Sequence, residues 1–322
     1  MTTLQRQFRL RVIIAFALVY VLWGSTYLGI AVAVRHIPPE LMTGVRFMIA
    51  GPVMLAACAL SGKRVAISRG DLLRQGVVGI LLLSVSNTVL CWAEQYVRSG
   101  LASLIIASVP IWFLVLDTWI FRGERLSARG LVGIALGLLG IFVLLWPKLV
   151  HPVAGGGHME LVGSISLLGC AGVWAIGSAL SRRWQNGVNA FTATAWQMTI
   201  AGAVNFLIAL ATGDAARADW SWQGLAAIGY LIVFGSWVGY TAYIWLLNNV
   251  PTSKVGTYAY VNPVIAVFLG WIALHERVDG YVLAGTGIVI IAVALANSAK
   301  LKPPVPAVGQ RRELAACEQT GD

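Results

Sequence analysis

The sequence predicts an all-α polytopic membrane protein with ten transmembrane helices, arranged as a 5+5 inverted-topology repeat around a central cavity. Three observations predict this fold class: an apolar composition, ten apolar runs of membrane-spanning length, and sequence similarity between the two halves of the chain. Of the 322 residues, 58% are hydrophobic and only 11% are charged, whereas soluble proteins carry about 25% charged residues. This composition excludes both a soluble domain and a disordered chain.

The first five apolar runs are separated by residues that break helices or carry charge. A helix needs about 20 mostly apolar residues to cross the bilayer core. His36–Pro39, Ser61–Lys63 and Arg122–Glu124 mark clear breaks, and Val97–Gly100 marks a weak one. The first run is too long for a signal-peptide core, so we expect it to persist as a helix. The predicted spans are Val12–Val34, Leu41–Leu60, Leu72–Trp92, Leu101–Phe121 and Gly130–Trp146.

Five further runs follow in the second half, with a clear break at Val250–Thr252. Glycines in the fifth and tenth runs, such as Gly137 and Gly285, allow close helix contact. The four cysteines have no paired spacing, so we expect neither a disulfide framework nor a metal site. The predicted spans are Leu161–Leu180, Ala190–Ala211, Leu225–Leu247, Val255–Leu274 and Val282–Ala299.

The distribution of Lys and Arg predicts that both termini are cytoplasmic. One side of the predicted topology carries 17 of the 23 Lys and Arg residues and the other carries 5, with Arg46 inside a span. The positive-inside rule places the richer side in the cytoplasm. The same rule explains the formal net charge of +10, so we expect no nucleic-acid partner. Residues 300–322 are predicted to form a disordered cytoplasmic tail.

The two halves share a pattern at a nearly constant offset. The matching pairs, 151 to 153 residues apart, are Trp23 with Trp174, Pro110 with Pro263, Trp119 with Trp271, Glu124 with Glu276 and Gly133 with Gly285. We therefore assign one five-helix repeat to residues 12–147 and a second to residues 161–299. Because each repeat has an odd number of spans, the two lie in the membrane with opposite orientations. Inverted repeats are typical of alternating-access carriers whose substrate site lies between the repeats.

These paired motifs also carry a family resemblance. Pro110–Ser127, Pro263–Val278, Trp23-Gly24-Ser25 and Arg46-Phe47 resemble the EamA-type branch of the drug/metabolite transporter superfamily, and the resemblance covers roughly residues 12–299. It implies a ten-helix bacterial exporter in which helices 1–4 and 6–9 wall a central cavity and helices 5 and 10 lie outside. The second motif is the degenerate copy, because His275 replaces Gly123 and no Ser follows Val278.

Two charged residues in the spans are candidate functional groups with structural alternatives. Arg46 either reaches the outer headgroups or a carbonyl, or faces the cavity and binds a substrate carboxylate. A charge at mid-bilayer costs about 2.5–3.5 kcal/mol on insertion scales. Glu94 either pairs with Arg98, four residues later, or faces the cavity as a proton site.

Three further acidic residues are expected to be structural. Asp117 lies near the cytoplasmic end of the fourth span, where Arg122 or Arg125 can pair with it, and a coupling role is the alternative. Glu124 and Glu276 precede helices, so each is expected to stabilise a positive helix end.

Aromatic and polar stripes at helical spacing predict the cavity wall. Polar groups that face lipid are costly, so we expect these stripes to face protein or a wet cavity, in contact with substrate or only with one another. Pro110 and Pro263 each remove a backbone hydrogen bond and bend a helix. We interpret the pair as matched hinges, with packing alone as the alternative. The candidate cavity residues are Tyr20, Trp23, Tyr27, Arg46, Ser84, Asn87, Glu94, Trp174, Ser178, Trp237, Tyr240, Tyr258 and Asn262.

The leading hypothesis is a secondary transporter of the bacterial inner membrane that exports small organic solutes, such as amino acids, including aromatic or hydrophobic ones. An exporter of multiple drugs or hydrophobic cations is the alternative, because aromatic side chains bind cations, and a channel is a weaker one. The predicted spans contain no cluster of His, Asp or Glu that could serve an intramembrane enzyme. The sequence also lacks the G-x-x-x-x-G-K-[ST] motif of proteins that hydrolyse ATP. We expect a monomer without cofactor or metal, whose partners are a small-molecule substrate and the lipid bilayer.

Overall fold

The computed structural model describes residues 3–97, 99–110, 112–113, 116, 128–150, 158–184, 187–274 and 280–298. Every regular element in these ranges is helical, which confirms the predicted fold class. Interactions that the sequence predicts for residues outside these ranges stay predictions. The residues of the sequence analysis outside the described ranges are Arg98, Asp117, Trp119, Phe121, Arg122, Gly123, Glu124, Arg125, Ser127, His275, Glu276, Val278, Ala299 and the tail 300–322.

The first half has helices at all five predicted spans. The first helix begins well before the predicted Val12, and the third span is one continuous rod in which a π-helical stretch, η1, joins two α-helices. The elements are α1 (Thr3–Ala33), α2 (Pro39–Leu60), α3 (Arg69–Gly79), η1 (Ile80–Ser86), α4 (Asn87–Ala93), α5 (Ser99–Ile106) and α7 (Ala128–Val150).

The second half repeats this order. Its third span, the eighth of the chain, also contains a π-helical stretch, η3, between two α-helices. The elements are α8 (His158–Arg183), α9 (Ala190–Ala211), the short 3-10 turn η2 (Asp214–Arg217), α10 (Trp222–Tyr230), η3 (Leu231–Tyr240), α11 (Thr241–Asn249), α12 (Thr252–Val255), α13 (Tyr258–Leu274) and α14 (Gly280–Ser298).

Many of these helices are membrane-spanning in character. Within the described ranges, six helical segments are long and apolar enough to cross a bilayer, and shorter apolar helices cover Leu131–Gly140 and Tyr258–Ala273. The chain is therefore a multi-pass membrane protein. The six long segments are Gln5–Ala33, Pro39–Leu60, Arg69–Ala93, Met159–Arg183, Ala190–Ala211 and Trp222–Asn249.

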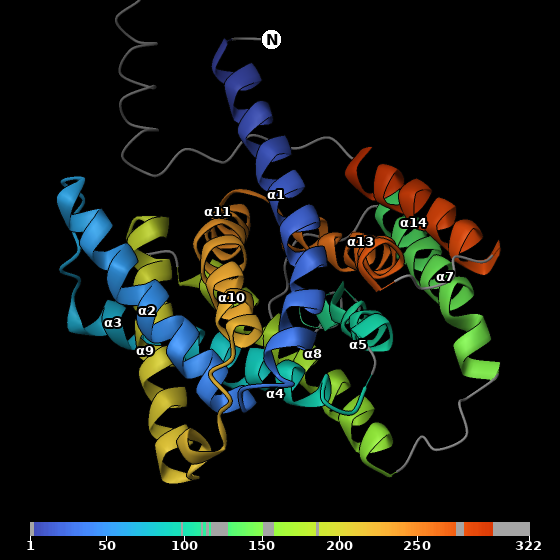
Figure 1. Cartoon of the computed structure of the whole chain (residues 1–322). Helices are drawn as coiled ribbons and strands as arrows, with labels where there is room; N and C mark the ends of the chain where they lie inside the picture. Colours follow the sequence, from blue (N-terminus) through green and yellow to red (C-terminus); the bar gives the residue numbers. More distant parts are fainter. Residues whose placement is uncertain are drawn as a thin grey trace, which may run out of the picture.

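The two halves are interleaved with approximate two-fold symmetry. α2 packs along α9, and α7 packs along α14 at one edge of the molecule (Figure 1). The first helix of each half then packs on the other half: α1 contacts α10, η3, α11 and α13, while α8 contacts α3, η1, α4 and α5. Exchanging the halves reproduces the same set of contacts, which is the arrangement expected of an internal repeat.

Glycines bring α2 and α9 into backbone contact. A Cβ added to Gly51 would lie 2.4 Å from the backbone nitrogen of Thr199, and one added to Gly202 would lie 2.5 Å from that of Met48. Gly51 and Gly202 are 151 residues apart, as are Met48 and Thr199, so the two contacts are equivalent under the repeat. Small residues allow such close approach of membrane helices. The α2–α9 crossing therefore lies on the pseudo-two-fold axis.

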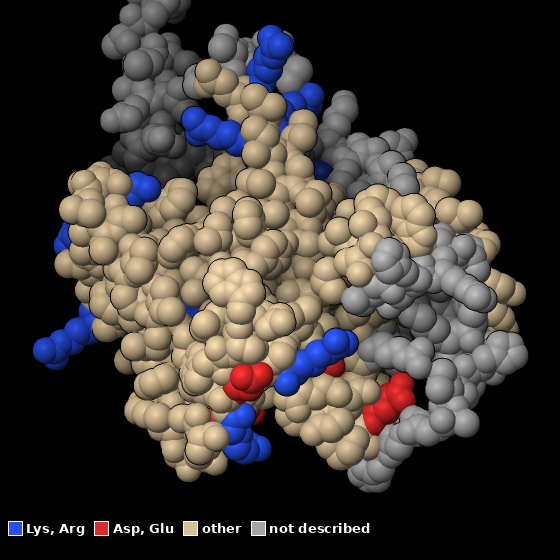
Figure 2. Space-filling model, in the orientation of Figure 1, with Lys and Arg blue, Asp and Glu red and all other residues tan. Residues whose placement is uncertain are grey.

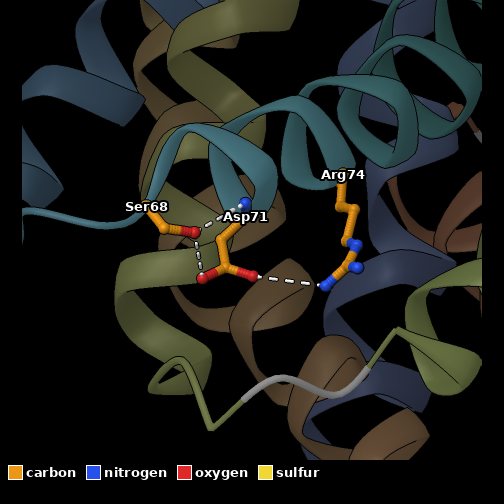
Figure 3. A network of polar contacts seen from close by, with 3 residues as sticks. All are labelled: Ser68, Asp71 and Arg74. Atoms are coloured by element: carbon orange, nitrogen blue, oxygen red, sulfur yellow. Dashed lines mark hydrogen bonds and ion pairs between the residues drawn. The ribbon is translucent and has the colours of Figure 1, made fainter.

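Serine caps fix where the third and eighth spans begin. The Ser68 hydroxyl accepts the backbone N–H of Asp71 at 3.1 Å and donates to its carboxylate at 2.7 Å, and that carboxylate faces Arg74 at 3.5 Å (Figure 3). Ser221 accepts the Gly224 N–H at 3.5 Å. Such caps satisfy backbone N–H groups that have no partner within the first helical turn. The two repeats thus begin the equivalent span with the same device.

The spans that contain Pro110 and Pro263 are both interrupted before the proline. Ala107–Ser108 form a turn ahead of Pro110, and Gly256–Thr257 form a turn ahead of Pro263. Hydrogen bonds of the i→i−3 type close both turns. A Cβ on Gly256 would lie 3.4 Å from the Pro110 ring, so the two interruptions touch each other. Whether these bends act as hinges stays a prediction.

The loops at the end opposite the N-terminus are tied together across the repeats. His36 Nδ1 lies 2.9 Å from the Asp219 carboxylate, and the Asp219 N–H donates to the His36 carbonyl at 2.7 Å. In this view the Asp and Glu side chains lie at this end with some Lys and Arg beside them, and further Lys and Arg lie around the N-terminal part of α1 (Figure 2). The positive-inside rule assigns orientation from the uneven distribution of Lys and Arg between the two sides of the membrane. The cytoplasmic location of the termini stays a prediction.

Candidate functional site

A pocket lies between the two halves. Its empty space, with the open mouth included, is about 670 Å³, an upper limit that suits a small molecule. Most of its wall is apolar or aromatic, with a few polar groups. The lining residues are Trp23, Thr26, Tyr27 and Ile30 of α1, Arg46 and Phe47 of α2, Leu83 and Ser86 of η1, Asn87 and Leu90 of α4, Ile106 of α5, Val109, Trp174 of α8, Gly235 and Tyr240 of η3, and Tyr258 and Asn262 of α13.

Four aromatic rings from both halves form a cluster at one end of the pocket. Trp23 and Trp174 pack edge to face with ring centroids 5.5 Å apart. Tyr243 lies 4.8 Å from Trp23 and 5.4 Å from Trp174, and Tyr258 lies 5.2 Å from Trp23. These separations fall in the favourable range for aromatic pairs. On α1 the lining residues run from Trp23 to Ile30, so this aromatic cluster closes the pocket toward the N-terminal end of the molecule.

Hydrogen bonds hold the aromatic cluster in place. The Tyr243 hydroxyl accepts the Trp174 indole N–H at 2.8 Å and bonds the Ser178 hydroxyl at 2.6 Å. A second chain of bonds reaches from the pocket wall into the protein. Tyr240 donates to Gln197 at 2.7 Å, and Gln197 donates in turn to Gln75 of α3 at 2.6 Å. Closure on this side therefore depends on contacts that join the two repeats.

Arg46 supplies a buried cation to the pocket wall. Its side chain is 5% exposed, its Nε donates to Ser236 Oγ at 2.9 Å, and its Cζ lies 4.8 Å from the centre of the Phe47 ring. Its Nη1 is buried and has no hydrogen-bond partner in the described part of the chain. Gly235 makes room for the guanidinium, because a Cβ there would lie 2.6 Å from Nη2. Arg46 thus lies in the wall rather than reaching the surface, with donor capacity left over.

The second repeat has no equivalent charge. Ile49-Ala50-Gly51 in α2 and Ile200-Ala201-Gly202 in α9 align the two helices, and this register puts Gln197 at the position of Arg46. Gln197 is fully buried in its bonds to Gln75 and Tyr240. The pocket is therefore aromatic on both sides of the axis but carries its cation on one side alone, as far as the structure describes it.

Glu94 is the second charged residue buried near the pocket. It follows α4, is 9% exposed, and neither carboxylate oxygen has a hydrogen-bond partner among the described residues. Its predicted partner, Arg98, lies outside those residues. In the same ranges no three His, Cys, Asp or Glu side chains come together as a metal site.

Comparison with known families identifies the chain. The EamA-like transporter family matches it twice, over residues 10–146 and 161–298, and so covers both halves. The chain belongs to the EamA-like transporter family. This membership confirms the resemblance found in the sequence and makes the protein a transporter rather than an enzyme.

Relatives and a solved structure agree with EamA-like membership. The uncharacterized inner membrane transporter YedA of Escherichia coli K12 is 37% identical over 295 residues, which span 91% of this chain and 92% of YedA. The uncharacterized transporter YoaV of Bacillus subtilis is 23% identical over 276 residues, 85% of this chain and 92% of YoaV. A crystal structure at 20% identity superposes with a TM-score of 0.70, covering 89% of this chain and 96% of that one, and shows the same fold.

Eight of the thirteen predicted cavity residues of this EamA-like transporter line the pocket. They come from six helical elements, and their contact with substrate stays a prediction. The remaining five do not line it: Tyr20 bonds Thr257 at 2.6 Å, Ser178 lies behind the aromatic cluster, Glu94 lies beyond Leu90, and Ser84 and Trp237 face other helices. The eight are Trp23, Tyr27, Arg46, Asn87, Trp174, Tyr240, Tyr258 and Asn262.

The π-helical stretches explain the positions of Ser84 and Trp237. Ser84 lies in η1 and donates to the Ala201 carbonyl of α9 at 3.2 Å, and Trp237 lies in η3 and donates to the Ala50 carbonyl of α2 at 2.9 Å. Both residues were grouped with pocket residues by α-helical spacing. A π-helix has wider turns, with i→i+5 bonds, so α-helical spacing does not place Ser84 on the face of Asn87 or Trp237 on the face of Tyr240.

Sequence reasoning missed several wall residues. Thr26 and Ile30 follow Trp23 and Tyr27 by three residues, so they belong to the stripe already recognised on the first span. Their side chains are small or purely aliphatic, so neither has the aromatic or strongly polar character that indicates a binding wall in a sequence. Tyr243 belongs to the aromatic cluster and does not itself line the pocket; it follows Tyr240 by three residues on the eighth span, and that spacing is the signal available for it.

Proposed function

We propose that this EamA-like transporter is a secondary carrier that exports small organic solutes, amino acids including aromatic and hydrophobic ones, by alternating access. The observation that carries the proposal is the pocket between the repeats, with aromatic walls and the buried, incompletely paired guanidinium of Arg46. Aromatic walls favour apolar or aromatic side chains, and a buried guanidinium favours a carboxylate. A single cation suits an amino acid better than a phosphate ester, which needs several.

The asymmetric closure of the pocket supports alternating access. The aromatic cluster closes the end toward the N-terminus with residues of both repeats, Trp23 from one and Trp174 from the other. A carrier must close one end of its site while the other opens, and inverted repeats commonly provide the two ends. We place the protein in the bacterial inner membrane with both termini in the cytoplasm, in keeping with the name of its relative YedA and with the positive-inside rule.

An exporter of hydrophobic cations is the second candidate. The observation that favours it is the density of aromatic rings around the pocket, since ring faces attract cations. Arg46 opposes it, because a buried positive charge repels a cationic solute. A channel is the weaker alternative, since the described pocket is closed at one end by packed aromatic rings.

Counterflow in proteoliposomes tests the proposal. Vesicles loaded with unlabelled L-phenylalanine or L-leucine should transiently accumulate the labelled amino acid, and the initial rate should saturate. Arg46→Gln should weaken the apparent affinity about tenfold or more, because one charge-assisted hydrogen bond is lost. Arg64→Gln, at an exposed position between α2 and α3, is the matched control and should transport normally.

Three results would contradict this function. Absence of counterflow with every amino acid tried would exclude amino acid transport. A flux that never saturates would indicate a channel. Uptake of tetraphenylphosphonium without any amino acid transport would favour the hydrophobic-cation exporter.

A further inference from the structure

We propose that Glu94 is a second charged pole of the pocket, which binds the ammonium group of the solute whose carboxylate binds Arg46. The inference rests on the proposed function, since it explains how the same site would select a zwitterionic amino acid over a solute with a single charge. Four observations carry it: the place of Glu94 in the fold, its burial, its missing partner, and its relation to Arg46.

Glu94 continues the face of α4 that lines the pocket. Asn87 and Leu90 are lining residues, and Glu94 follows them by seven and four positions. Residues at this spacing lie on one side of a helix, and Glu94 itself keeps helical backbone angles. Tyr27, another lining residue, lies within electrostatic reach of the Glu94 carboxylate. Glu94 therefore lies one turn beyond the lining part of α4, on the face of the helix that lines the pocket.

The Glu94 carboxyl group is buried without compensation. It is 9% exposed, and neither oxygen accepts a hydrogen bond from a described residue. Buried carboxylates are normally paired, because removing an unpaired charge from water is very unfavourable. A cationic group from outside the protein would supply the missing partner. The ion pairs of the described ranges use other residues: His36 with Asp219, Asp71 with Arg74, and Asp214 with Arg217.

Arg46 and Glu94 act on the same region without pairing with each other. Cys91, one turn before Glu94 on α4, lies within electrostatic reach of both side chains. No ion pair within 4.0 Å joins them in the described structure. Each therefore keeps unused capacity of opposite sign: Nη1 of Arg46 as a donor and both oxygens of Glu94 as acceptors.

A zwitterion satisfies both groups at once, which a singly charged solute cannot do. Binding a carboxylate alone would leave the Glu94 carboxylate buried and unpaired. Binding an amine alone would leave Nη1 of Arg46 without an acceptor. The group left without a partner penalises the wrong ligand, and this kind of discrimination is stronger than that of an apolar pocket. The two poles thus provide selectivity that the aromatic walls lack.

Two matched sets of probes separate the two charges. One set is L-phenylalanine, phenylpropanoate, which lacks the amino group, and phenethylamine, which lacks the carboxylate. The other is L-leucine, isocaproate and isoamylamine. Binding to the purified full-length chain in detergent is measured by isothermal titration calorimetry. Size-exclusion chromatography and thermal unfolding without ligand establish that each variant is folded.

We expect the wild type to bind each amino acid about ten- to a hundredfold more tightly than either of its analogues. Glu94→Gln should lose this preference over the carboxylate analogue, because the ammonium group no longer gains a charged partner. Its affinity for the carboxylate analogue itself should stay within about twofold. Glu40→Gln is the matched control, because Glu40 also lies within electrostatic reach of Cys91 but is partly exposed. It should discriminate as the wild type does.

Two results would overturn the assignment of Glu94 while leaving the proposed function intact. One is a Glu94→Gln variant that still prefers the amino acids as the wild type does. The other is an equal loss of preference in Arg98→Gln, which would make Glu94 a structural partner of that residue. If the folded wild type binds neither amino acid, the proposed function itself fails, and this inference fails with it.

Discussion

Replacing Gly51 or Gly202 by alanine should destabilise the protein, because neither position has room for a methyl group. The new Cβ atoms would lie 2.4 Å and 2.5 Å from backbone nitrogens of the facing helix, whereas ordinary contact begins near 3.4 Å. The α2 and α9 backbones would therefore have to separate by about 1 Å (3.4 − 2.4 = 1.0). Overpacking costs about 1–3 kcal/mol, which exceeds the gain of up to about 1 kcal/mol from alanine in a helix. We expect a net loss of about 1–2 kcal/mol for each variant.

The double variant gives the sharper result. Because the two glycine contacts lie on the same crossing, the separation forced by one methyl group makes room for the other. The double variant should therefore lose about 0.5–1 kcal/mol less stability than the sum of the losses of the two single variants. Equilibrium unfolding in mixed micelles with an increasing fraction of SDS gives the free energy of unfolding for the wild type, both single variants and the double variant.

Gly169→Ala and Gly229→Ala are matched controls. Both glycines are helical, and nothing lies within 4 Å of the Cβ that either would gain. These variants should be neutral or more stable by up to about 1 kcal/mol. The argument for a shared close crossing would be refuted if Gly51→Ala and Gly202→Ala behaved like these controls, or if their penalties were fully additive.

Three further predictions concern the aromatic cluster, a helix cap and the topology. Tyr243→Phe removes the hydroxyl that bonds Trp174 and Ser178, and should lower the free energy of unfolding by about 1–3 kcal/mol in the same assay; an unchanged value would contradict its role. Ser68→Ala should cost about 1 kcal/mol, and Ser68→Asp, which still caps α3, much less; equal losses would argue against the cap. In intact cells a membrane-impermeant maleimide should label Ala216→Cys and not Ala66→Cys, both at exposed positions between spans, and the reverse pattern would invert the predicted orientation.

Periodicity and the internal repeat were sufficient to identify much of the pocket. Trp23 was recognised by its stripe on the first span, and its match at Trp174 by the offset of 151 residues. The structure brings the two rings into contact, because a residue near a two-fold axis meets its own equivalent. The burial of Arg46 was open to two interpretations from sequence, since the choice depends on the facing Ser236 and Gly235, far away along the chain.

The π-helical stretches could not be predicted from the sequence. Ile80–Ser86 and Leu231–Tyr240 have ordinary apolar composition, and hydrophobic periodicity offers no signal when every side of a helix is apolar. The resulting error is confined to two positions. Ser84 and Trp237 face α9 and α2 instead of the pocket. Asn87 and Tyr240, three residues after each of them, line the pocket as predicted. The contacts of Tyr243 were missed for a different reason, because they join three helices whose relative rotation only packing determines.

The contacts on the pseudo-two-fold axis have a consequence for the origin of the fold. Gly51 meets Thr199 as Gly202 meets Met48, so the joining surface is built from the same positions of each repeat. In a homodimer such a surface is isologous and self-complementary. A single five-helix ancestor that inserted in both orientations would already have possessed this crossing before the two copies were fused. Fusion then allowed the copies to diverge, so that Arg46 in one repeat and Gln197 at the equivalent position of the other leave a charge at one of the two positions alone.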